Sequence, residues 1–166
     1  VGLYLKLRDK FHNSFLLESS DYHGNENNFS FICLEPIASF IVQHETISIK
    51  TAGSETQKEI TKRKDVISEL QKFIAQFKIQ NTSSVSNGIF GYTAYDSVKY
   101  FETLDLNDSK RKNTIPEMNY SLFRFIIQID HFKNELTILE NKTEETDSQI
   151  QKIADLVQSN NPPRYH

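Results

Sequence analysis

The apolar and polar positions near the start of the chain predict a β-hairpin. Residues 15–17 and 29–32 are short apolar or alternating runs, and residues 21–27 between them are rich in Gly, Asn and Asp, which allow a chain reversal. Pro36 lacks a backbone donor, so this first pairing should end or kink there before residues 37–42 continue as a further strand.

Two further antiparallel pairings follow from the same alternation. Residues 46–50 alternate cleanly and should pair back on residues 38–42. Residues 122–130 and 135–140 predict a second hairpin around a short turn. Its first strand is apolar on both faces near residues 125–127, which is typical of a central strand covered on both sides.

Helical periodicity marks two segments, each with one apolar stripe. In the first, Asp65 is expected to cap the regular part, and the stripe consists of Ile60, Ile67, Leu70, Phe73, Ile74 and Phe77. In the second, Thr146 or Asp147 is expected to be the cap, and the stripe consists of Ile150, Ile153, Ala154 and Val157. Residues 2–8 alternate in a way that fits either a strand or a short helix.

The segment from residue 88 to residue 101 predicts a strand followed by a helical turn. Residues 88–92 should be a buried strand in which Gly88 and Gly91 permit close backbone approach. After it, Tyr95, Val98 and Phe101 have helical spacing. The charged residues 104–113 are expected to form an exposed loop.

Antiparallel strand pairs with helices on the outside indicate an α+β domain. A length of 166 residues is enough for one domain with a substantial core and too short for two. We assign that domain to residues 1–159. Residues 160–166 contain adjacent prolines and are expected to begin a linker to further protein.

Charge and cysteine content exclude several classes of function. The formal net charge is −3, with 25% charged residues, so no basic surface for nucleic acid or an anionic membrane is expected. Cys33 is the only cysteine, which excludes a disulfide framework and favours a reducing, cytoplasmic setting. No apolar run approaches the roughly 20 residues that cross a bilayer.

Candidate catalytic groups are few and scattered. The sequence contains no nucleophile elbow, phosphate loop, dinucleotide fingerprint or metal-ligand spacing. The acid/base candidates are the isolated carboxylates Glu18, Glu35, Asp96 and Glu102, and single carboxylates are weak evidence of catalysis. Glu18, Ser19 and Ser20 are unusual because they directly follow two leucines in a predicted strand, where polar groups need partners or a wet cavity. Strand alternation leaves open whether Glu18 faces such a cavity or simply points outward.

Three ordered blocks resemble the N-terminal part of anthranilate synthase component I, a chorismate-using enzyme family. The first joins Leu16-Leu17-Glu18-Ser19 with Asn28-Phe29-Ser30-Phe31-Ile32 and Glu35-Pro36. The second is GIFGYTAYDSVKYFE, residues 88–102, and the third joins Ile115-Pro116-Glu117-Met118 with Leu122-Phe123-Arg124-Phe125. The resemblance implies orthogonally packed antiparallel sheets with helices outside, and a short helix ahead of the Leu-Glu-Ser segment.

The same resemblance implies a regulatory role. In that family L-tryptophan binds the Leu-Glu-Ser segment, so the expected site residues are Leu17, Glu18, Ser19 and Phe29. Glu18 would face the ligand's ammonium group, Ser19 would bind its polar end, and Leu17 with Phe29 would line an indole pocket. The chorismate and Mg²⁺ sites are expected in an absent C-terminal domain, so this chain alone should be inactive and without a cofactor. The parent protein would be a lyase of tryptophan biosynthesis with a glutaminase subunit as partner.

Two departures from the family pattern bear on this assignment. Asn28 stands where relatives usually carry Arg, and Cys33 stands where they carry Gly. The Asn28 change removes a cation near the expected pocket, which could weaken tryptophan binding. Two alternatives therefore remain open: the N-terminal domain of aminodeoxychorismate synthase component I, and a non-catalytic binding module.

Overall fold

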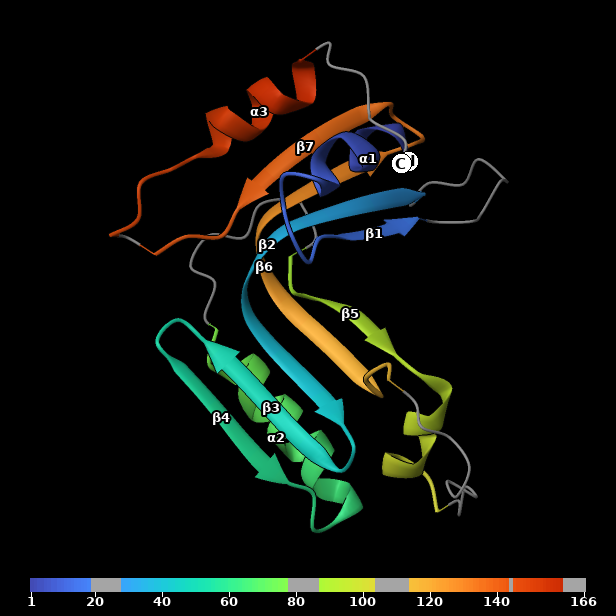
Figure 1. Cartoon of the computed structure of the whole chain (residues 1–166). Helices are drawn as coiled ribbons and strands as arrows, with labels where there is room; N and C mark the ends of the chain where they lie inside the picture. Colours follow the sequence, from blue (N-terminus) through green and yellow to red (C-terminus); the bar gives the residue numbers. More distant parts are fainter. Residues whose placement is uncertain (19–27, 78–86, 104–113, 144, 160–166) are drawn as a thin grey trace. The chain divides into compact units, whose positions relative to one another are not determined.

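A computed structural model describes residues 1–18, 28–77, 87–103, 114–143 and 145–159. The elements are α1 (Gly2–Arg8), β1 (Phe15–Glu18), β2 (Phe29–Gln43), β3 (Thr46–Thr51), β4 (Ser54–Glu59), α2 (Arg63–Ala75), β5 (Ile89–Thr93), the 3₁₀ helix η1 (Tyr95–Tyr100), β6 (Met118–Asp130), β7 (Glu135–Glu140) and α3 (Ile150–Gln158). The α+β class and the antiparallel pairing are confirmed (Figure 1). The segment that could be strand or helix, residues 2–8, is helical.

The described strands form one seven-stranded sheet with the order β4-β3-β2-β6-β5, to which β1 adds on β2 and β7 on β6. The resemblance led us to expect more than one sheet. A single sheet forms because β2 and β6 are long strands, of 15 and 13 residues, and each pairs with different neighbours along its length. The prediction that the strand at residues 122–130 is central is confirmed, although this strand begins earlier, at Met118.

The chain divides into two compact units, and β2 and β6 contribute residues to both. The first unit comprises Val1–Pro36, Thr82–Gly88 and Phe123–His166, and the second comprises Ile37–Asn81 and Ile89–Leu122. Each unit has its own hydrophobic cluster. The length had led us to expect a single core. The assignment of one domain to residues 1–159 stays a prediction, and residues 160–166 lie outside the described residues.

In the first unit, α1 and α3 contribute to a core on β2 and β6. The buried residues of this cluster are Leu7, Ile32, Leu34, Phe125, Ile127 and Ile153. Helix α3 lies beside β7 (Figure 1). It begins at Ile150 with Gln149 as its N-terminal cap residue, so the expected cap at Thr146 or Asp147 is wrong. The Ser148 hydroxyl, 3.4 Å from the Ile150 amide, supplies the local acceptor instead.

In the second unit, α2 packs one face against β2 and β3. The buried cluster consists of Ala38, Phe40, Val42, Ile47, Val66, Phe73, Tyr100, Met118 and Leu122. Val66 is buried, whereas Ile74, which we placed on the apolar stripe, is exposed. Asp65 supports the helix start from its third position, because its carboxylate accepts hydrogen bonds from the Lys62 amide and the Thr61 hydroxyl.

Three expectations for the second unit need correction. β4 was missed because its six residues, SETQKE, are all exposed and carry no apolar alternation. β5 is half-buried and not fully buried. In η1 the buried residues are Ser97 and Tyr100, which are three apart and so share one face of the 3₁₀ helix, whereas the expected row fails at Tyr95, which is 83% exposed.

At Pro36 we predicted that the first strand pairing ends or kinks, and the structure shows that β2 changes its pairing partner there. β2 runs through Pro36 as one strand, but β1 pairs with it only up to Cys33 and β3 pairs with it only from Ser39. Between these pairings Glu35 adopts a positive φ of 58°, a conformation that a non-glycine residue rarely takes. The change of pairing partner and the positive φ of Glu35 therefore fall within the same few residues of β2.

Candidate functional site

The first hairpin brings Leu17 and Phe29 to one face of the sheet. In the β1–β2 register Leu17 is opposite Phe31, and Phe29 lies two residues from Phe31 on the same face. The Phe29 and Phe31 rings are 6.3 Å apart in a tilted arrangement. Leu17 and Phe29 are both half-buried. An apolar platform is thus present at the end of the hairpin.

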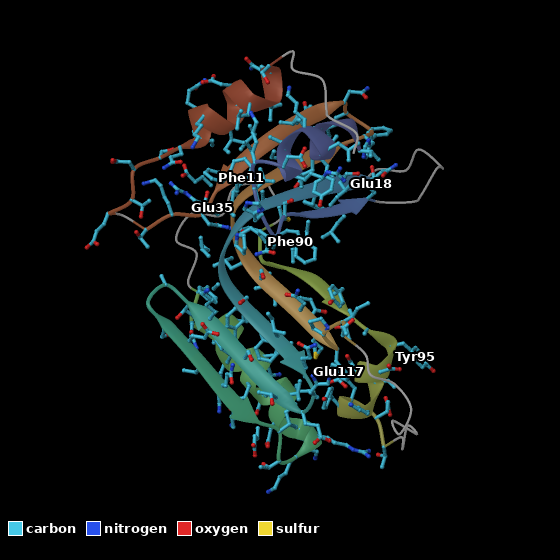
Figure 2. The ribbon with its side chains drawn as sticks, viewed as in Figure 1. Phe11, Glu18, Glu35, Phe90, Tyr95 and Glu117 are labelled. Atoms are coloured by element: carbon cyan, nitrogen blue, oxygen red, sulfur yellow. The ribbon has the colours of Figure 1, made fainter. Side chains whose placement is uncertain are left out.

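Glu18 lies on the other face of this ladder, opposite Ser30. Its side chain is 46% exposed. Figure 2 shows Glu18 at the end of β1. Of the four expected tryptophan-binding residues, the structure describes Leu17, Glu18 and Phe29, whereas Ser19 lies outside the described residues.

The other candidate carboxylates are not gathered into one site. Glu35 lies in the first unit, whereas Asp96 and Glu102 lie in the second. Glu35 is 3.4 Å from Arg124, a residue that sequence reasoning did not single out as functional. Among the described residues no three His, Cys, Asp or Glu side chains come together to hold a metal ion.

Arg124 is the centre of a largely buried ionic cluster in the first unit. Its side chain is only 11% exposed, and its Nε and Nη2 atoms donate to Glu140 Oε1 at 3.1 and 3.0 Å. Nη2 also donates to the Asp147 carbonyl oxygen at 3.1 Å. Glu140, 4% exposed, accepts further bonds from the Ser148 hydroxyl and the Gln149 amide. The cluster thereby fastens the segment before α3 to β6 and β7.

The environment of Glu140 favours its charged form. Burial by itself would raise the pKa of this carboxyl group. The hydrogen bonds from Ser148 and Gln149 and the Arg124 guanidinium outweigh that effect and hold the pKa below its ordinary value of 4.5. Glu140 is therefore ionised at neutral pH, as a structural partner of Arg124.

In the second unit, Glu117 is also the centre of a polar cluster. It links the third sequence block, to which it belongs, to the second block, residues 88–102. Its carboxylate accepts hydrogen bonds from Lys99 Nζ and, at 2.7 Å, from the Tyr100 hydroxyl. Its carbonyl oxygen accepts from the Ser97 hydroxyl and the Ala94 amide. Figure 2 places Glu117 at the start of β6. The quoted motifs contained these residues, but their spacing gave no sign that they contact one another.

These contacts show what two of the sequence blocks do in the fold. Glu117, Lys99 and Tyr100 are about as buried as Arg124, and all are satisfied by protein partners. These residues hold η1 against the start of β6.

The described residues contain no helix that is long and apolar enough to cross a membrane.

A family model described as chorismate binding enzyme matches residues 13–166 of this chain. Anthranilate synthase component 1 of Saccharomyces cerevisiae is 31% identical over 139 residues, which are 80% of this chain and 24% of the yeast protein. The protein of the same name from Methanothermobacter marburgensis is 24% identical over 137 residues, 82% of this chain and 28% of the relative. The chain therefore spans about a quarter of the length of these relatives.

A solved structure shows the same fold. The crystal structure of anthranilate synthase component I from Streptococcus pneumoniae matches 92% of this chain and 32% of its own, with a TM-score of 0.54 and 19% identity. The three sequence blocks and the α+β fold agree with the match of the family model, which extends over nearly the whole chain. The chain belongs to the family of chorismate binding enzymes.

Proposed function

We propose that this chain is the N-terminal, tryptophan-sensing portion of an anthranilate synthase component I. The whole protein would convert chorismate and ammonia to anthranilate and pyruvate in tryptophan biosynthesis. A glutaminase subunit would supply the ammonia, and Mg²⁺ would bind in a C-terminal domain. The proposal rests on the relatives, which carry that name, and on the order of the three blocks along this chain.

The apolar platform at the end of the first hairpin is the observation that supports tryptophan sensing. Leu17 and Phe29 share one face, which suits one side of an indole ring. Glu18 is the last residue of β1, so a ligand's ammonium group can approach its exposed carboxylate from beyond the strand. Ser19 would then bind the polar end of the same ligand.

Inhibition would arise from coupling between this site and the C-terminal domain. Tryptophan would favour an arrangement of the two domains that binds chorismate poorly, and chorismate would in turn weaken tryptophan binding by the same factor. The residues of this chain only bind and orient the effector.

The test measures anthranilate formation by the full-length protein. Chorismate, Mg²⁺ and ammonium are supplied, L-tryptophan is titrated, and Ser19→Ala and Glu18→Gln are compared with the unaltered protein. A tenfold weakening of inhibition, about 1.4 kcal/mol, is expected in each variant. Glu55→Gln, an exposed strand carboxylate of the second unit, is the matched control and should leave the titration unchanged.

Three outcomes would contradict parts of the proposal. Anthranilate formation without any response to tryptophan would make Leu17-Glu18-Ser19 a structural segment in this protein. Formation of aminodeoxychorismate in place of anthranilate would favour the related synthase. Absence of both products would favour a non-catalytic binding module.

A further inference from the structure

We propose that His131 and Ser30 position Phe29 for effector binding, so that the turn between β6 and β7 forms part of the effector site. This inference rests on the proposed tryptophan-sensing function. It adds two positioning residues: Ser30, from the same sequence block, and His131, which lies 101 residues further along the chain.

The turn contacts the start of β2 on both sides of Phe29. The His131 amide donates to the Asn28 carbonyl oxygen at 3.0 Å. The Nε2 atom of the same histidine is 2.7 Å from the Ser30 hydroxyl oxygen. The residues before and after Phe29 are therefore both hydrogen-bonded to His131, one through its backbone amide and the other through its side chain. These two contacts fix the backbone on either side of Phe29, and the Phe29 ring is the part that would contact the effector.

Hydrogen bonds from a buried side chain define the backbone of this turn. Asp130 is buried, and its Oδ1 atom accepts hydrogen bonds from the Phe132 and Lys133 amides, each at 3.0 Å. Asn134 closes the turn with a φ of 55°. A side chain that accepts from the amides two and three residues further along the chain is a common way to fix a tight turn. His131 is consequently held in place by its neighbours.

The position of Ser30 connects this support with Glu18. The two residues are cross-strand partners in the β1–β2 ladder, so their side chains lie on the same face at close distance. Ser30 is buried, whereas His131 is exposed above it. His131 thereby shields and orients the hydroxyl that lies next to the carboxylate expected to bind the ligand's ammonium group. The ligand class is an aromatic amino acid with a free amino group.

The proposal is tested in the full-length protein by titrating L-tryptophan against anthranilate formation. His131→Ala and Ser30→Ala are each expected to raise the inhibitory concentration of tryptophan about fivefold, and His131→Gln should restore most of the sensitivity because its amide can reach the Ser30 hydroxyl. The double variant should be no less sensitive than either single variant, since both remove the same contact. Each titration is normalised to the variant's own rate without tryptophan.

His12→Ala is the control, because His12 is an exposed histidine in another turn of the same unit. If His131→Ala and Ser30→Ala behave like this control while Ser19→Ala and Glu18→Gln weaken inhibition, the positioning role is wrong and the proposed function stands. If the unaltered protein does not respond to tryptophan at all, both are wrong. If His131→Ala does not fold, Ser30→Ala alone decides between the two results.

Discussion

At the scale of single residues, Gly91 has the least room for a side chain among the glycines that the structure describes. A Cβ atom built there would lie 1.8 Å from the carbonyl oxygen of Asn119 on the neighbouring strand, whereas at Gly88 it would meet no atom of the described residues within 4 Å. We expect Gly91→Ala to lower the free energy of unfolding by about 3 kcal/mol and Gly88→Ala to change it by less than about 0.5 kcal/mol. Urea denaturation of both variants checks this, and equal effects would contradict it. The prediction of close backbone approach is thus confirmed for Gly91 and wrong for Gly88.

Cys33 illustrates how burial controls the reactivity of a single group. Its side chain is fully buried, and desolvation raises the pKa of the thiol to about 12. Since the thiolate is the reactive form, we expect no labelling by iodoacetamide in the folded chain at pH 8 and rapid labelling in urea. Cys33 is the only cysteine, so mass spectrometry of the labelled chain reports on this site alone. Fast labelling without denaturant would contradict the buried environment.

At the scale of secondary-structure elements, the Arg124 cluster predicts how the stability of the first unit depends on pH. The pKa of Glu140 is lowered by folding, so its stabilising contribution is fully present above 4.5 and is lost as the pH falls through the lower, folded-state value. We expect Glu140→Gln to destabilise the chain at pH 7 and to have a smaller effect below pH 4.

Urea denaturation at a series of pH values measures this difference. Glu135→Gln is the control, because Glu135 is an exposed carboxylate of the same strand. A constant difference between Glu140→Gln and the unaltered chain over the whole pH range would show that the charge of Glu140 is unimportant.

Glu117 predicts how firmly η1 is held to β6. Removing its carboxylate leaves the Lys99 ammonium and the Tyr100 hydroxyl without the acceptor that they share. Because these groups are largely buried, we expect Glu117→Ala to lower the free energy of unfolding by about 3 kcal/mol. Glu102→Ala, an exposed carboxylate just beyond η1, should have almost no effect. Similar denaturation midpoints for the two variants would contradict this role.

At the scale of the whole molecule, two hydrophobic clusters are joined by two continuous strands. β2 and β6 each contribute to both clusters, so loss of either core should loosen the same strands. We expect Phe73→Ala in the second unit and Ile153→Ala in the first to lower amide-exchange protection along the whole of β2. The comparison uses the amides of Leu34 and Phe40 by NMR. Loss of protection only in the unit that carries the substitution would show that the units open separately.

The sequence by itself determined much of this protein. The apolar runs and their alternation predicted β1, the pairing of β2 with β3, and the β6–β7 hairpin, because side chains on successive strand positions face opposite sides of the sheet. The α+β class followed from those elements, and the three blocks led to the family. β4 was not predicted because its residues are all polar. The predicted apolar stripe of α2 was wrong at Ile74, which is exposed, since periodicity cannot tell which edge of a stripe faces the core.

Only the tertiary structure decided which polar residues meet. Glu35 and Arg124 are separated by 89 residues along the chain, Lys99 and Glu117 by 18, and Ser30 and His131 by 101, so no local pattern relates them. It also decided the register that puts Leu17 and Phe29 on one face of the sheet. The physical reason is that hydrophobic periodicity specifies which side of an element is buried, whereas the partner of a polar group depends on strand order and register. Those are properties of the folded chain.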